Sequence, residues 1–174
     1  HEKHITLALR KRGYESFLPT YVKSHRDSKH FDVPLFPGYV FCRLEAAKPL
    51  AVITIPGVFS IVGNGRVPEP IPEQEMSGIR QTLEMGLIAC PWPYVEPGQE
   101  ICLESGPLRG LRGLVISSRD AKWVVVSIHL LQRSIAVKVE RESFSESSIK
   151  VRVPAASILS GNVQAVTESP RIHP

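Results

Sequence analysis

The sequence lacks the features of several protein classes. No apolar run approaches the ~18–20 residues that a bilayer span needs, and the longest, Trp123-Val-Val-Val-Ser-Ile, has only the length of a strand. The first residues are polar and charged, unlike the apolar core of a signal peptide. The three cysteines, Cys42, Cys90 and Cys102, form no CxxC pair and cannot all be bridged. We therefore expect a cytoplasmic protein without membrane contact or a disulfide framework.

Catalytic and metal-binding patterns are equally scarce. His25, Asp27 and His30 do not have the spacing of a zinc site, and Cys42 lies in an apolar stretch typical of a buried thiol. Gly63-Asn-Gly65 is followed by prolines, whereas a phosphate-binding loop opens onto a helix. The sequence therefore predicts a protein that is not an enzyme and that holds no cofactor or metal.

What the chain does contain is enough apolar sequence for a core and an uneven charge. Its 174 residues are 43% hydrophobic and 22% charged, which is typical of one large or two small globular domains. Residues 1–30 hold seven Lys or Arg against three Asp or Glu, a net charge of +4, while the rest is balanced. This basic segment indicates either an anionic partner such as nucleic acid or a solvated face.

The first half of the chain predicts an α+β domain. Ile5, Ala8 and Leu9 share one helical face, and Gly13 is a natural helix terminator. The polar segment 23–32 has no period and predicts a loop or hairpin tip. In chain order we expect a helix over 1–12, strands over 14–21 and 39–44, a short helix over 46–53, a turn at Pro56-Gly57, a strand over 58–62, a tight turn over 63–65 and a helix from Pro72. Together they predict an antiparallel sheet flanked by helices over residues 1–86.

The second half predicts a different architecture. Three prolines, Pro91, Pro93 and Pro97, favour an extended linker over 87–98. Short strands separated by turn residues are then expected over 101–103, 114–117, 123–131 and 134–140, which can bury a core by curling into a small β-barrel over 99–142. Residues 143–174 are rich in Ser without a strong period and are expected to form a mobile tail.

Two stretches resemble one known family. Pro34-Leu-Phe-Pro-Gly-Tyr-Val-Phe41, Ile55-Pro-Gly-Val58 and Pro68-x-Pro-Ile-Pro72 resemble the N-terminal domain of NusG-type transcription elongation and antitermination factors. Pro97-Gly98-Gln99 followed by Glu104-Ser-Gly-Pro-Leu-Arg-Gly-Leu-Arg-Gly-Leu-Val115 resembles the KOW motif that follows that domain in the same family. The resemblance implies an SH3-like five-stranded barrel for the second domain, and it covers roughly residues 1–140.

The sequence also departs from the family pattern. Family members usually place a strand at the centre of the sheet just before the first helix, and no such segment precedes His1 here. We therefore expect that the chain is trimmed or that its first residues are missing, because without such a strand the sheet would lose its middle and could expose an edge that pairs with a neighbour. In the second half, the family's usual Ile-Phe-Gly-Arg stretch reads Leu130-Leu131-Gln132-Arg133. This difference favours a specialised paralogue over the general factor.

The resemblance implies that the first domain grips the clamp helices of RNA polymerase. The residues that match this role are Phe36, Pro37, Tyr39 and Phe41, although two of the three aromatic side chains are expected to be core residues. The short helix that ends at Thr54 would face the opposite side of the polymerase cleft. Bridging the cleft would shift the polymerase toward its closed, elongating state and modulate pausing and termination.

Further partners are implied for the loop and the barrel. Lys23, Arg26 and Lys29 occupy the position of a hairpin that approaches DNA, so they are candidates for phosphate contacts. In the barrel, the candidates for binding a small-subunit ribosomal protein or the Rho termination factor are Arg109, Arg112, Leu130, Leu131 and Arg133. The alternative interpretation is a KOW-type module that binds RNA or the ribosome without contacting polymerase.

Overall fold

The fold is α+β, with antiparallel sheets and few helices. The computed structural model describes residues 1–24, 30–44, 50–64, 67–94, 100–103, 109–117, 122–139, 149–152 and 163–168. The chain divides into a first unit, residues 1–73 with 159–174, and a second unit, residues 74–158. Within the described ranges, none of the helices combines the length and the apolar character that a bilayer span needs.

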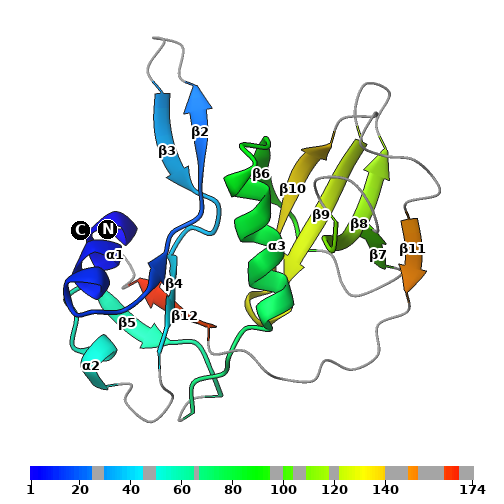
Figure 1. Cartoon of the computed structure of the whole chain (residues 1–174). Coiled ribbons are helices and arrows are strands. Elements are labelled where there is room, and N and C mark those ends of the chain that lie inside the picture. The colour runs from blue at the N-terminus through cyan, green and yellow to red at the C-terminus, as the bar shows by residue number, and fades with distance from the viewer. Residues whose placement is uncertain are drawn as a thin grey trace. The chain divides into compact units, whose positions relative to one another are not determined.

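The first unit is built on a four-stranded sheet with two helices and a hairpin. Its strand order is β1-β4-β12-β5, and β2 pairs with β3 in a separate hairpin that extends away from the sheet (Figure 1). Its elements are α1 (Glu2–Lys11), β1 (Ser16–Phe17), β2 (Thr20–Ser24), β3 (His30–Pro34), β4 (Tyr39–Arg43), α2 (Leu50–Ile53), β5 (Val58–Ile61) and β12 (Val163–Glu168).

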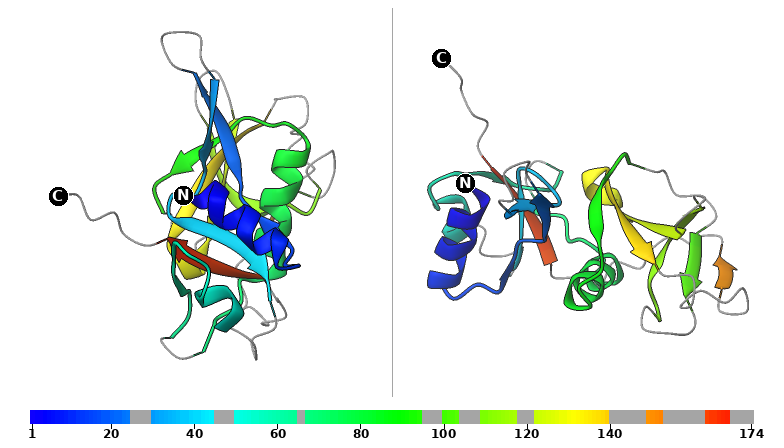
Figure 2. Two further views of the ribbon diagram at one scale, coloured as in Figure 1. Left: turned by 90° about the vertical axis from the view of Figure 1, so that its left-hand side faces the viewer. Right: turned by 90° about the horizontal axis from the view of Figure 1, so that it is seen from above.

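The core of the first unit lies between α1, α2 and one face of the sheet. Ile5 and Leu9 of α1 pack with Val40 and Cys42 of β4 and with Val166 of β12. The views in Figure 2 show α1 beside β4 and β12. The helix ends as its sequence predicts, because Gly13 takes a φ of +85° and Arg10 and Lys11 lie in its last turn.

The middle of this sheet differs from the expectation. The sheet has a central strand, and that strand is β12, which pairs antiparallel with β4 on one side and β5 on the other. It lies in the range for which the sequence predicts a mobile tail. Ala165 and Val166 are buried there, at 0% and 1% exposure, so apolar burial on both faces of the sheet, together with two hydrogen-bonded ladders, holds the segment in place.

The second unit is a six-stranded antiparallel sheet with one long helix. The strand order is β11-β7-β8-β9-β10-β6, and the described ladders contain none between the end strands β11 and β6. Its elements are α3 (Glu73–Glu84, whose first residue belongs to the first unit), β6 (Ala89–Trp92), β7 (Glu100–Leu103), β8 (Arg112–Ser117), β9 (Lys122–Ile128), the 3-10 turn η1 (His129–Leu131), β10 (Arg133–Val139) and β11 (Ile149–Arg152).

α3 packs closely on this sheet through a small residue. Met76 and Ile79 are fully buried, and a Cβ added at Gly78 would come within 3.0 Å of Leu111 Cδ1. The helix begins at Glu73, one residue later than expected, and Pro72 precedes it. The close contact places α3 with the second unit, whereas the sequence predicts it as part of a domain over 1–86.

Two segments that the sequence predicts as linker and tail contribute strands to this sheet. Residues 89–92 form β6, which pairs with β10 through Pro91↔Ile135 and Cys90↔Ala136. Proline is tolerated there because β6 is a terminal strand of the sheet and needs hydrogen bonds on one side only. Residues 149–152 form β11, which pairs with β7. The predicted boundaries 87–98, 99–142 and 143–174 therefore differ from the observed units.

Candidate functional site

A tight turn positions the aromatic residue that begins β4. The Tyr39 backbone N–H donates to the Phe36 carbonyl at 3.1 Å, and Gly38 has a φ of +84°. Proline followed by a glycine of positive φ is the arrangement of a type II turn. The Gly38 N–H also donates to Glu2 Oε1 at 3.1 Å. The turn is therefore held to the first residue of α1, and Tyr39 leaves it in a fixed direction.

The pKa of the Glu2 carboxylate reflects this contact. Partial burial acts to raise its pKa, but the backbone N–H groups of Glu2 and Gly38 that donate to it lower the pKa below its ordinary value. The group is therefore ionised at neutral pH. Because the folded-state pKa is depressed, its contribution to stability is present above the unfolded pKa and is lost as the pH falls through the folded one.

The three aromatic candidates divide into two buried rings and one accessible ring. Phe36 and Phe41 are 1% and 0% exposed, whereas Tyr39 is half-buried. The Phe36 and Phe41 rings meet edge to face with centroids 5.5 Å apart, and Phe17 lies 6.4 Å from Phe41. The expectation that two of the three are core residues is confirmed. Of the four candidate residues in this segment, exposed Pro37 and half-buried Tyr39 are the two that a partner can reach in this conformation.

Thr54 has a structural role that its sequence position did not reveal. Its hydroxyl accepts a hydrogen bond from Arg12 Nη1 at 2.9 Å and donates to the Ala51 carbonyl at 3.3 Å. Arg12 Nη1 also donates to the Ala51 carbonyl. These bonds join the end of α1 to α2 and satisfy a carbonyl of a helix only four residues long.

The short helix that ends beside Thr54 has an exposed apolar surface. Leu50 and Ile53 of α2 are 74% and 42% exposed. Exposed large apolar side chains close together are typical of interaction surfaces. The four residues of this helix are all apolar, but only Val52 is buried. An apolar helix too short to bury all of its side chains is the sequence signal for such a surface.

The β2–β3 hairpin presents mixed basic and aromatic character. Lys23 is exposed and lies opposite Phe31, which is 54% exposed, and Tyr21 lies opposite Val33. Paired residues and their i+2 neighbours share a face of a hairpin, so these four side chains belong to one face. Lys3 Nζ lies 3.7 Å from Asp32 Oδ2 and connects the hairpin to α1. Arg26 and Lys29 lie outside the described residues.

The candidate residues of the second unit are partly exposed. Arg109, Arg112 and Arg133 are exposed, Leu130 is half-buried and Leu131 is 7% exposed. Of the expected apolar pair, Leu131 is buried, so Leu130 is the one that a partner can contact. The neighbouring His129 is fixed by α3, because Glu75 Oε1 lies 3.0 Å from His129 Nδ1 and Glu75 Oε2 accepts the His129 backbone N–H at 3.3 Å. No sequence pattern indicates this pair, because its members are 54 residues apart.

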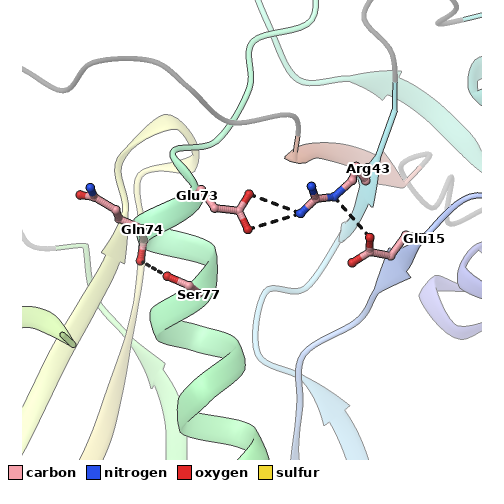
Figure 3. Close-up of polar contacts among 5 residues, drawn as sticks. All are labelled: Glu15, Arg43, Glu73, Gln74 and Ser77. Carbon is pink, nitrogen blue, oxygen red and sulfur yellow. Dashed lines mark hydrogen bonds and ion pairs between the residues drawn. The ribbon is translucent and has the colours of Figure 1, made fainter. Parts of the chain in front are cut away.

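Charged contacts elsewhere are those of a solvated surface. Arg43 Nε lies 3.3 Å from Glu15 Oε2, and Arg43 Nη2 lies 3.4 Å from Glu73 Oε1 (Figure 3). The three side chains are about half exposed, so each pair contributes little to stability. Figure 3 also shows Ser77 Oγ donating to the Gln74 carbonyl at 3.1 Å, a local bond within α3.

The described residues offer little for catalysis. No group of three His, Cys, Asp or Glu that could hold a metal occurs among them, and His25 and Asp27 lie outside the described residues. Cys42 is 1% exposed, and burial raises its pKa to about 12. A thiol with that pKa is not a nucleophile at neutral pH, so Cys42 is a packing residue.

Comparison with known proteins identifies one family. Residues 1–80 match the family model described as "Transcription termination factor nusG". The match includes the Pro37-Gly38 turn, Tyr39, the β2–β3 hairpin and α2. No curated protein and no solved structure matches the chain significantly.

Proposed function

We propose that the first unit docks on RNA polymerase, because residues 1–80 match the model of the NusG family of transcription factors. NusG-family factors are non-catalytic proteins that generally bind RNA polymerase. The proposed target is the clamp-helix coiled coil of the enzyme. The second unit would then recruit a further partner to the elongating complex.

Tyr39 is the observation that supports this proposal most directly. Its ring is half-buried, its backbone is fixed by the Pro37-Gly38 turn, and Phe36 and Phe41 fill the core beside it. A rigid aromatic residue with an apolar body and a polar tip is typical of the residues that dominate binding energy in interfaces. In this proposal Tyr39 and Pro37 contact the polymerase, whereas Phe36 and Phe41 hold Tyr39 in position.

The α2 surface is the proposed second contact with polymerase. Leu50 and Ile53 of α2 are exposed, and the hydrogen bonds of Arg12 with Ala51 and Thr54 fix this short helix to the end of α1. Contact of this surface with the opposite side of the cleft would favour the closed clamp by differential binding to that state. Modulated pausing and termination would follow from the shift in population.

Nucleic-acid contacts are proposed for the hairpin. Lys23 is exposed beside the partly exposed Phe31, and Arg26 and Lys29 add positive charge to the same segment. Cations there would contact phosphates and make binding salt-dependent.

The second unit is proposed to act as a KOW-type recruitment module. Arg109, Arg112 and Arg133 are exposed cations, and Leu130 adds apolar area beside Arg133. These groups would contact a small-subunit ribosomal protein or the Rho factor. A closed SH3-like barrel is part of this proposal, with the strands β7 to β10 as its consecutive members.

A binding experiment with matched variants tests the polymerase contact. Purified RNA polymerase is captured by the wild-type chain, by Tyr39→Ala and by Leu7→Ala, with circular dichroism confirming that each is folded. Leu7 is 56% exposed on α1, which packs on the sheet face that contains Val40 rather than Tyr39. We expect the loss of an interface anchor, about 10-fold or more weaker binding, for Tyr39→Ala and no change for Leu7→Ala.

Two outcomes contradict the proposal in different ways. Equal binding by Tyr39→Ala and wild type would place the contact elsewhere on the first unit. No binding by the folded wild type would leave the alternative, a module that binds RNA or ribosomes through the exposed arginines of the second unit. Filter binding of RNA to Arg133→Ala and wild type would then test that alternative.

A further inference from the structure

Two turns of the second unit carry the residues that are proposed to bind its partner. β7, β8, β9 and β10 follow one another both along the chain and across the sheet (Figure 1). In such a meander alternate connections leave the sheet at the same end, so the connections that lead into β8 and into β10 lie at one end. The proposed residues are Arg109 and Arg112 in the β8 turn (residues 109–112) and Leu130 and Arg133 in the β10 turn (residues 129–133).

The helix α3 contacts both turns. A Cβ added at Gly78 would lie 3.0 Å from Leu111 Cδ1, and Gln81 Nε2 lies 3.5 Å from a carbonyl oxygen of the same β8 turn. Glu75, earlier in the helix, contacts His129 in the β10 turn. Helical residues three positions apart lie on adjoining parts of the helix surface. One stretch of α3 therefore joins the two turns.

Glu75 fixes both the backbone and the ring of His129. Its Oε2 accepts the His129 backbone N–H at 3.3 Å, and its Oε1 lies 3.0 Å from His129 Nδ1. A carboxylate only accepts hydrogen bonds, so Nδ1 carries a proton. The Glu75 side chain is 15% exposed, and hydrogen bonds to a charged group shielded from water are among the stronger ones. The Tyr94 ring meets the His129 ring edge to face, with centroids 6.2 Å apart.

The β10 turn contains a conformation that needs such support. Gln132 has a φ of +48°, a left-handed conformation that is unfavourable for a residue with a Cβ. Its backbone N–H donates to the His129 carbonyl at 3.1 Å, so the turn closes on the residue that Glu75 fixes. Strained residues persist where the surrounding structure holds them, and they are concentrated in functional segments.

We propose that α3 is the support that fixes the two turns as one partner-binding surface, with Glu75 as the positioning residue for Leu130 and Arg133. This inference rests on the proposed recruitment function of the second unit. A surface fixed before binding costs less conformational entropy when the partner docks. Loss of the Glu75 contact should therefore weaken binding by loosening the β10 turn, although no group that touches the partner is removed.

Nuclear magnetic resonance of the isotope-labelled full chain tests the support without a partner. At about pH 8, where an ordinary imidazole is neutral, the ring nitrogen shifts of His129 should show the Nδ1–H tautomer in wild type and lose it in Glu75→Ala. The His129 amide should exchange about 10-fold or more faster in that variant. Glu75→Gln, which keeps one acceptor oxygen, should lie between the two.

The matched control is Glu84→Ala, on an exposed residue at the end of the same helix, and it should give the wild-type spectrum around His129. An unchanged tautomer and unchanged exchange in Glu75→Ala would overturn the proposal. If Glu75→Ala does not fold, Glu75→Gln decides the result, because it retains the shape of the side chain and loses its charge and one acceptor.

Binding to two purified probes then tests the role of the surface. Rho factor and small ribosomal subunits are titrated separately with each full-length variant, under conditions in which tryptophan fluorescence shows a folded second unit. For a probe that wild type binds, we expect about 10-fold weaker binding by Glu75→Ala, a partial loss by Glu75→Gln and no change for Glu84→Ala. Equal binding by Glu75→Ala and wild type would overturn the positioning role. Binding of neither probe by wild type would overturn the recruitment function itself, whereas the resonance spectra decide independently whether α3 fixes the turns.

Discussion

Both units contain an antiparallel sheet, but the two sheets differ in how the order of their strands follows the chain. In the second unit, β7, β8, β9 and β10 are neighbours both in the sheet and along the chain. In the first unit the order β1-β4-β12-β5 places no two consecutive strands side by side, and the central strand comes after the whole second unit in the sequence. A sheet of sequential hairpins can form from local contacts, whereas the first sheet must close a very long loop before its middle is filled.

The unfolding of the two units can be followed separately with two spectroscopic probes. Both tryptophans, Trp92 and Trp123, belong to the second unit, so tryptophan fluorescence follows that unit alone. Far-UV circular dichroism follows both. Separate transitions by the two probes would show that the units unfold independently, and coincident ones would show a single cooperative unit.

The largest effect is expected for Val166→Asp, which places a carboxylate in the core at the centre of the first sheet. An unpaired buried charge costs about 3–5 kcal/mol, enough to unfold the first unit while tryptophan fluorescence of the second stays native. Denaturant titration followed by both probes measures this. Val22→Asp, on the 63% exposed Val22 of the hairpin, is the control. Loss of the tryptophan signal in Val166→Asp would contradict the independence of the units.

In the second unit, Gly113→Ala should be the most damaging small substitution. An added Cβ would lie 2.3 Å from the Val125 carbonyl oxygen and 2.8 Å from Val124 Cγ1, so β8 and β9 would have to separate. Overpacking of this kind costs about 1–3 kcal/mol. Gly110→Ala is the comparison, because Gly110 has a φ of +89° but open space around it, and its cost is about 1 kcal/mol of backbone strain. Tryptophan-monitored unfolding should rank Gly113→Ala as the less stable variant.

A smaller effect is expected for Arg12→Ala in the first unit. The substitution removes the hydrogen bonds that join the end of α1 to Ala51 and Thr54. Exposed hydrogen bonds of this type contribute about 0.5–1.5 kcal/mol, so circular dichroism should report a small shift in the first transition. Lys11→Ala, on the exposed neighbour of Arg12, should leave the transition unchanged. An equal loss of stability in Arg12→Ala and Lys11→Ala would show that the removed charge, and not the hydrogen bonds, causes the loss.

The smallest effect is a difference in thiol reactivity. Cys42 remains protonated in the folded protein to about pH 12, whereas an exposed thiol ionises near pH 8.5. Cys42 should therefore react with a disulfide reagent at pH 8 far more slowly than half-buried Cys90, and at the normal rate in denaturant. The same shift means that stability falls as the pH rises above the unfolded thiol pKa. Fast labelling of native Cys42 would indicate that β12 leaves the sheet frequently.

Local chemistry made much of the fold predictable. Gly13, Pro37-Gly38 and Pro56-Gly57 mark chain turns because their backbone preferences act without distant partners, and Gly38 and Gly57 take φ values of +84° and +93°. The strands Tyr39–Arg43 and Val58–Ile61 follow the expected ranges. β6 was not predicted, because Pro91 and Pro93 are typical of a linker. The sheet accommodates Pro91 because β6 is a terminal strand, in which the missing N–H of proline is tolerated.

The candidate site was predictable in outline only. The segment 36–41 is rich in aromatic residues, and the sequence correctly gives two of them to the core. The order of residues in this segment does not by itself show that Phe36 lies in the core with Phe41 and that Tyr39 stays accessible. The exposure of Leu50 and Ile53 and the bond between Glu75 and His129 depend on elements that meet only after folding.

What the sequence by itself determined is therefore the set of local conformations: the α+β content, the turns, the end of α1 at Gly13 and the apolar strands of the second unit. Only the tertiary structure decided which segments share a sheet. Val163–Glu168 is too short and too polar to be stable as an isolated strand, and its position between β4 and β5 exists because two edges more than 100 residues earlier in the sequence provide hydrogen bonds and an apolar core. The free energy that orders this strand comes from its partners rather than from its own sequence.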